Sequence, residues 1–279
     1  LAFALMLVFV AWPLGELAVE SFIGQESGRL GLENYAEFFG SSYFRRALFN
    51  SLTVGALGTL IALCIGVPLA LAYARYDFPG RGAIEVAILL SMLSPPFVGA
   101  YAWILMFGRS GWVAEFARGF GVELPPIYGT LGISVASAFG LYPLVFLVVR
   151  GGLARVNRSL EEAAYSLGRG RIGVTLTVTL PLVLPALLTA ALLVFLGVVS
   201  DFGTPAILGE GERFPVLATL AFSLYLSEIG AEPGMAATTC MILLAIAFAL
   251  VLGVRFLSGR RSVASDAGGG AELKRLRGG

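Results

Sequence analysis

Residues 159–168 read Ser159-Leu160-Glu161-Glu162-Ala163-Ala164-Tyr165-Ser166-Leu167-Gly168, and they lie at the centre of a polar loop, residues 150–179, between two hydrophobic segments. Ser159 is followed three residues later by Glu162, which is the spacing of a capping box and predicts a helix beginning at Leu160. Gly168 can adopt the left-handed conformation that ends a helix. The predicted helix has about two turns and is too short to be stable alone in water.

The predicted helix has one apolar face. Leu160, Ala163, Ala164 and Leu167 occur at positions i, i+3, i+4 and i+7, so they share that face. A short helix of this kind between membrane segments needs a surface to pack against. Two alternatives follow from the residues alone: the helix folds back on its own transmembrane helices, or it is a docking element for another protein.

The loop carries a longer pattern: Glu162-Ala163-Ala164, three residues, Gly168, nine residues, then Val178-Thr179-Leu180-Pro181. This resembles the EAA loop of ABC importer permeases, with valine in place of the usual isoleucine. In that family the loop helix occupies a groove of the cytoplasmic ATPase. The resemblance implies an ATPase-coupling role for ten residues: Ser159, Leu160, Glu161, Glu162, Ala163, Ala164, Leu167, Gly168, Leu180 and Pro181.

The composition indicates an all-α integral membrane protein. The chain is 57% hydrophobic and 13% charged, whereas soluble domains carry about 25% charged residues. It has no histidine, and its two cysteines, Cys64 and Cys240, lie in apolar stretches where packing is the expected role. We therefore predict no catalytic residue, no metal site and no cofactor bound by this chain. A net charge of +1 suggests no nucleic-acid partner.

Six transmembrane helices are predicted from runs of about 20 apolar residues: 1–23, 50–74, 84–107, 127–149, 179–200 and 234–256. They form one permease domain, 1–257, followed by a flexible basic cytoplasmic tail, 258–279. The chain begins with leucine, so we expect the natural N-terminus to be missing and interpret the first segment as an uncleaved span.

Two of the predicted spans carry local signals. In the third, Ser94-Pro95-Pro96 must break the helix near the middle of the membrane. In the second, small residues recur every four positions and allow close approach of another helix: Ala62, Gly66, Ala70 and Ala74.

The distribution of lysine and arginine predicts the orientation. One side of the six-span topology holds 13 of these residues, including both ends of the chain and the loop 150–179, and the other side holds 6. The positive-inside rule therefore places the loop and both termini in the cytoplasm.

The chain contains one EAA-like loop and no Gly-x4-Gly-Lys-Ser/Thr phosphate loop, so it is expected to be a transport subunit rather than an enzyme. The resemblance implies two ATPase subunits that bind ATP and Mg²⁺, and a periplasmic or lipid-anchored solute-binding protein. It also implies a second permease half: a copy of this chain, a related chain, or part of a longer fused chain. The expected location is the cytoplasmic or inner membrane of a bacterium or archaeon.

Asp201 follows a charge-free run of 29 residues, 172–200, and is placed near the outer membrane face. It is either a turn residue or part of the gate. The aromatic residues Tyr101 and Trp103 either pack or line the pathway. The full set of candidate pathway and gate residues is Asp201, Phe202, Gly203, Pro205, Ser94, Pro95, Pro96, Tyr101 and Trp103.

The cargo is less sharply indicated. Residues 94–103, 200–209 and 214–225 resemble the ferric-iron and 2-aminoethylphosphonate branch of these permeases. We therefore expect ferric iron, with 2-aminoethylphosphonate or a polyamine- or thiamine-type solute as alternatives. An ion-coupled secondary transporter predicts inverted repeats and intramembrane charges, and a membrane-embedded enzyme predicts a reactive cluster; the sequence shows none of these signals.

Overall fold

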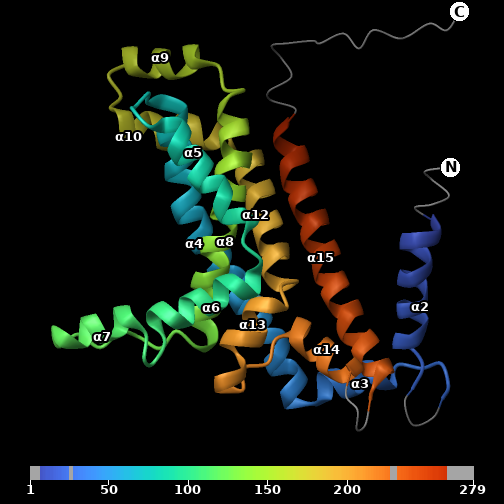
Figure 1. Cartoon of the computed structure of the whole chain (residues 1–279). Helices are drawn as coiled ribbons and strands as arrows, with labels where there is room; N and C mark the ends of the chain where they lie inside the picture. The colour runs from blue at the N-terminus through green and yellow to red at the C-terminus, as the bar shows by residue number, and fades with distance from the viewer. Residues whose placement is uncertain (1–6, 25–27, 227–230, 263–279) are drawn as a thin grey trace, which may run out of the picture.

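A computed structural model describes residues 7–24, 28–226 and 231–262 of the chain (Figure 1). Within that part the secondary structure is helical, apart from one isolated antiparallel bridge between Ile23 and Leu30. The longer helices are α2 (Trp12–Ser21), α3 (Glu33–Gly40), α4 (Ser42–Arg75), α5 (Arg81–Leu90), α6 (Pro96–Phe107), α7 (Trp112–Gly119), α8 (Gly129–Leu153), α9 (Arg158–Ser166), α12 (Leu184–Val199), α14 (Leu217–Leu226) and α15 (Pro233–Ser262).

Shorter helical segments connect them. Two are π-helical, η1 (Leu7–Ala11) and η3 (Thr175–Thr179), and two are 3₁₀ turns, η2 (Ser91–Leu93) and η4 (Glu210–Glu212). The others are α10 (Arg171–Val174), α11 (Leu180–Leu182) and α13 (Gly203–Leu208). The predicted all-α fold class is confirmed.

Three helices form the core: α4 packs against α8, and α12 packs against both. The small-residue positions predicted in α4 explain part of this packing, because Ala62, Gly66 and Ala70 are buried. A Cβ atom at Gly66 would lie 2.6 Å from the Cβ of Val145 in α8, so the two backbones approach as closely as glycine allows. Ala74, the fourth position of the stripe, is partly exposed.

The third turn of α4 is joined to the start of α14 and the residues just before it by two hydrogen bonds. The amide of Asn50 donates to the carbonyl of Pro215 at 2.9 Å, and the hydroxyl of Ser51 accepts from the backbone N–H of Leu217 at 2.8 Å. A second apolar cluster lies here, formed by residues of α3, α4, α14 and α15: Phe38, Phe44, Ala47, Leu217, Leu220, Met235 and Ile242. Helix α2 packs against α15, and Figure 1 shows α3, α14 and the beginning of α15 at the same end of the molecule.

The predicted break at Ser94-Pro95-Pro96 is present, and it is sharper than a kink. The helical segments Arg81–Leu93 and Pro96–Gly119 meet at 104°. Two consecutive prolines remove backbone donors and disfavour helical geometry in the residues before them. As a result α6 and α7 run away from α5 across the molecule (Figure 1).

The segment between the third and fourth predicted spans, residues 108–126, contains a helix, α7. Glycines at 108, 111, 119 and 121 dominate this stretch and suggest a loop. The residues between them still form two turns, with Glu115 in the first turn and Arg118 in the last. Charges in these positions stabilise the helix through its dipole.

The fifth predicted span, 179–200, also begins with a bend. The segments Arg171–Leu182 and Leu184–Val199 meet at 71°, next to Pro185. Within the part of the chain that the structure describes, three helices can cross a membrane singly by length and composition: Ser42–Arg75, Gly129–Leu153 and Pro233–Leu257. Up to five spans result there if each bent pair counts as one.

Six crossings therefore stay a prediction. Residues 7–21 of the first predicted span form η1 and α2, and residues 1–6 lie outside the described part. Helix α15 continues to Ser262, so the predicted flexible tail 258–279 is helical at its start, and residues 263–279 lie outside the described residues. The last turns of α15 point to the end of the molecule that carries α9 (Figure 1).

Candidate functional site

The predicted loop helix exists as α9, but its N-cap residue is not Ser159, which the capping box predicts. Asn157 is the N-cap residue: its backbone is extended, and its side-chain oxygen accepts from the backbone N–H of Ser159 at 3.0 Å. Ser159 lies within the first turn instead. Asparagine is as good an N-cap residue as serine, and it comes two positions earlier, so the helix begins earlier than predicted.

The predicted end of α9 is confirmed. Gly168 has a φ of 81°, the left-handed conformation. Its N–H donates to the carbonyl of Tyr165, and the N–H of Arg169 donates to that of Ala164. These bonds satisfy carbonyl groups that the end of a helix leaves without partners.

Glu161 anchors α9 to the membrane helices. Its carboxylate accepts from the guanidinium of Arg75, the last residue of α4, at 2.7 Å, and from the hydroxyl of Thr179 at the end of η3. Arg75 also donates to the hydroxyls of Thr179 and Thr175, each at 2.6 Å. One guanidinium thus joins α4, α9 and η3.

Sequence reasoning placed Glu161 in the coupling loop but missed these partners. Thr179 occupies the unspecified position of the EAA-like pattern and is fully buried. Arg75 directly follows the charge-free run of α4. A charge at the end of such a run was the one sequence signal that could have marked Arg75 as a partner of Glu161. The sequence separations, 86 residues between Arg75 and Glu161 and 104 between Arg75 and Thr179, explain why local pattern did not reveal the contact.

Most of the predicted apolar face of α9 is exposed. Of the four predicted apolar-face residues, Ala164 is buried against the protein, whereas Leu160, Ala163 and Leu167 are exposed, and Leu167 is 85% exposed. Glu162 is exposed as well. Of the last two predicted coupling residues, Leu180 packs against the core and Pro181 is exposed. The helix therefore packs against its own membrane domain through Glu161 and Ala164, and its two leucines, Leu160 and Leu167, are exposed to solvent.

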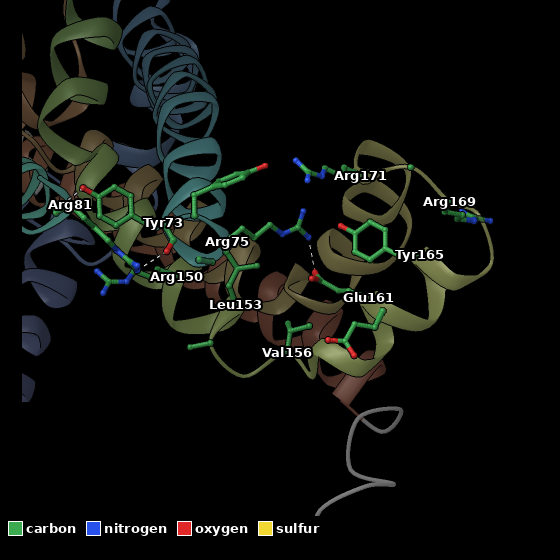
Figure 2. A pocket seen from close by; sticks show the side chains of 15 residues that line it. Tyr73, Arg75, Arg81, Arg150, Leu153, Val156, Glu161, Tyr165, Arg169 and Arg171 are labelled. Atoms are coloured by element: carbon green, nitrogen blue, oxygen red, sulfur yellow. Dashed lines mark hydrogen bonds and ion pairs between the residues drawn. The ribbon is translucent and has the colours of Figure 1, made fainter. Parts of the chain in front are cut away.

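An open cavity of about 910 Å³ lies between α9 and the ends of α4 and α8. Its lining includes five arginines: Arg75, Arg81, Arg150, Arg169 and Arg171. Figure 2 shows Arg75 reaching Glu161 across this space, with Arg81, Tyr73 and Arg150 grouped at the other side.

Charge at the α4–α8 side of the cavity is balanced by acidic and aromatic groups. Arg150 forms an ion pair with Glu85 of α5. The guanidinium carbons of Arg81 and Arg150 lie 5.4 Å and 5.9 Å from the ring centroid of Tyr73, within the range of cation–π attraction. Tyr73 is 2% exposed, so this aromatic platform is part of the core.

A second cavity, of about 350 Å³, collects five of the nine predicted pathway residues: Ser94, Pro95, Pro96, Trp103 and Asp201. It lies between η2, α6, α8 and α13. The remaining predicted pathway residues do not line it. Tyr101 is 59% exposed, Phe202 contacts Phe222 with tilted rings whose centroids are 4.5 Å apart, Gly203 packs on Phe97, and Pro205 is buried.

The side chain of Asp201 stabilises the turn at the beginning of α13. Its Oδ1 accepts from the backbone N–H groups of Gly203 at 2.8 Å and Thr204 at 3.4 Å. The turn interpretation of Asp201 is therefore correct, and the same residue also lines the cavity. Within the described residues, no group of three or more histidine, cysteine, aspartate or glutamate side chains could hold a metal ion.

Residues 62–262 match the model of a protein family described as "Binding-protein-dependent transport system inner membrane component". The ferric transport system permease protein FbpB of Actinobacillus pleuropneumoniae is 28% identical over 250 residues, which are 89% of this chain and 35% of FbpB. The chain thus spans about a third of that relative's length.

The molybdenum transport system permease protein ModB of Escherichia coli K12 is 32% identical over 213 residues, 74% of this chain and 90% of ModB. Among solved structures, a bacterial alginate ABC transporter in complex with a periplasmic protein contains a chain of the same fold. The TM-score is 0.75 at 19% identity, covering 93% of this chain and 91% of that one.

Proposed function

Because the chain belongs to the family of binding-protein-dependent transport system inner membrane components, we propose that it is the permease subunit of an ATP-driven ABC importer. It forms half of the translocation pathway and pairs with a second permease half, either a copy of itself or a related chain. Two ATPase subunits bind ATP and Mg²⁺, and a periplasmic or lipid-anchored binding protein delivers the solute.

The observation that carries this proposal is the two-sided arrangement of α9. Glu161 bonds the helix to the membrane domain through Arg75 and Thr179. The side chains of Leu160, Ala163 and Leu167 are exposed to solvent. Exposed leucines on a helix that is fixed to the membrane domain suit docking into an apolar groove. Closing of the ATPase dimer pushes α9, and the bonds of Glu161 pass this displacement to α4 and η3.

The proposed orientation places α9 in the cytoplasm. It rests on the excess of lysine and arginine on the side of the loop, 13 residues against 6. In that orientation the cavity lined by Asp201 lies toward the outer face, because Figure 1 shows α6 and α13 at the end opposite α9.

We propose ferric iron as the cargo. The FbpB relative, named for ferric transport, supports this choice, as does the resemblance of residues 94–103, 200–209 and 214–225 to the ferric-iron and 2-aminoethylphosphonate branch. The ModB relative, named for molybdenum transport, makes an oxyanion the main alternative, followed by 2-aminoethylphosphonate and polyamine- or thiamine-type solutes.

The test is co-purification followed by reconstitution. The tagged chain is extracted in detergent, and mass spectrometry identifies the proteins that come with it. We expect an ATPase with a phosphate loop, and after reconstitution with it and the binding protein, solute uptake that requires ATP. Recovery of the chain alone, with uptake that follows an ion gradient and ignores ATP, would contradict the proposal.

A further inference from the structure

The cavity between α6, α8 and α13 has one ionisable side chain in its lining. Among the described residues that line it, Asp201 alone is charged, and none is lysine or arginine. Its Oδ1 is committed to the turn at Gly203 and Thr204, whereas Oδ2 makes no hydrogen bond within the described part of the chain. One carboxylate oxygen therefore fixes the backbone, and the other is available to a molecule in the cavity.

A second polar group of the cavity has no partner. Ser137, in the middle part of α8, is 6% exposed, and its Oγ has no hydrogen-bond partner among the described residues. Buried hydroxyl groups nearly always have a partner, so one that lines a cavity without a partner points to a ligand that supplies it. The nearby serine of α8, Ser134, donates to the carbonyl of Thr130 instead, four residues earlier.

Aromatic rings form another wall of the same cavity. Trp103 stacks on Phe107 with ring centroids 5.0 Å apart, and Phe139 approaches it edge-on at 5.2 Å. The faces of such rings attract cations, tryptophan most strongly. A carboxylate, a hydroxyl and an aromatic wall without a basic residue make this environment unfavourable for an anion.

We propose that this cavity is a transient contact site for the solute, selective for positively charged solutes bearing N–H or O–H donors, such as a hydrated metal ion or an ammonium compound. Asp201 supplies the countercharge, Ser137 accepts or donates one hydrogen bond, and Trp103 shields the positive charge from lipid. A single carboxylate suits weak binding and rapid release. This proposal rests on the proposed importer function and favours a cationic cargo over an oxyanion such as molybdate.

The experiment uses the detergent-solubilised full chain without any ATPase. Trp12 and Trp112 are replaced by phenylalanine, which leaves Trp103 as the one tryptophan, and its fluorescence is followed while hexaamminecobalt(III) is added. Molybdate at matched ionic strength is the anionic probe. We expect a saturable change with hexaamminecobalt(III) and no saturable change with molybdate.

Three variants distinguish cation binding in the cavity from cation binding to charges elsewhere on the surface. Asp201→Asn keeps an Oδ1 acceptor for the turn, and it should weaken cation binding about tenfold, as expected for the loss of a hydrogen bond to a charged group. Ser137→Ala should weaken it about threefold and leave the melting temperature unchanged or higher, since it removes an unsatisfied hydroxyl. Asp77→Asn, whose side chain is 95% exposed and outside this cavity, should bind as the parent does.

Saturable binding of molybdate, or cation binding that Asp201→Asn leaves intact, would overturn the proposal, as would an equal loss in Asp77→Asn. The proposed importer function is tested by a different experiment, ATPase co-purification, so its failure can be told apart from failure of the cation site. A chain that binds the cation and recovers no ATPase would refute the importer, and one that recovers the ATPase and binds only molybdate would refute the cation site.

Discussion

The carboxylate of Glu161 in α9 lies 2.7 Å from the guanidinium of Arg75 at the end of α4, and both side chains are about four-fifths buried. Glu162, the next residue and the first letter of the EAA-like pattern, is exposed. Adjacent acidic residues of one short helix therefore face in different directions, one toward the membrane domain and the other toward solvent.

This difference predicts different effects of two matched substitutions. Glu161→Gln leaves Arg75 without its countercharge and should loosen α9 by about 1–2 kcal/mol, between the values for exposed and buried ion pairs. Trypsin should then cut the loop at Arg169 or Arg171 several-fold faster. Glu162→Gln should leave the cleavage rate unchanged and weaken ATPase docking. Equal cleavage of both variants would show that Glu161 does not anchor the loop.

Gly168 is predicted to be required for its conformation rather than for space. A Cβ atom there would meet nothing within 4 Å, but φ is 81°, so Gly168→Ala should cost about 1–2 kcal/mol of local stability. Transport should become uncoupled from ATP hydrolysis while membrane insertion stays normal. Gly170→Ala is the control, because Gly170 has equally open surroundings and a φ of −70°. Similar coupling ratios for the two variants in proteoliposomes would contradict the prediction.

The exposed leucine at the end of α9 is predicted to contact the ATPase. Leu167→Glu should reduce ATPase co-purification about tenfold, as expected for loss of one buried leucine at an interface, and should leave the permease's own melting temperature unchanged. Leu30→Glu is the control, since Leu30 is 76% exposed and precedes α3 at the other end of the molecule. Retention of the ATPase by Leu167→Glu, or its loss from both variants, would argue against docking through α9.

The close approach of α4 and α8 gives a prediction about stability. Gly66→Ala places a methyl carbon 2.6 Å from the Cβ of Val145, so the helices must separate, at a cost of about 1–3 kcal/mol. Thermal unfolding in detergent should occur at a lower temperature. Gly253→Ala in α15 meets nothing within 4 Å and should leave the unfolding temperature unchanged or slightly higher. A stable Gly66→Ala variant would mean that the α4–α8 contact adapts freely.

Features set by neighbouring residues were predictable from the sequence. The helix α9, the left-handed Gly168 and the break at Ser94-Pro95-Pro96 each follow from a local signal. The N-cap was misplaced because two capping candidates, Asn157 and Ser159, stand two residues apart, and backbone conformation decides between them.

Features set by distant residues were not predictable. The bond between Arg75 and Glu161 joins residues 86 positions apart, and Ser137 and Asp201, which line one cavity, come from α8 and from the turn that follows α12. The 104° angle at the proline pair depends on what α6 and α7 pack against, so the pattern indicates a break and leaves its direction open.

Helix α4 has a mechanical consequence that goes beyond its packing. Side chains hold α4 at its last residue, Arg75, and in its third turn, at Asn50 and Ser51. The part of α4 from position 50 to position 75 spans about 37 Å at 1.5 Å per residue, so it is nearly as long as the membrane is thick. In the proposed coupling, a displacement of α9 would be passed along α4 to α14, and Pro68, which lacks an N–H to bond the preceding turn, is where α4 can flex.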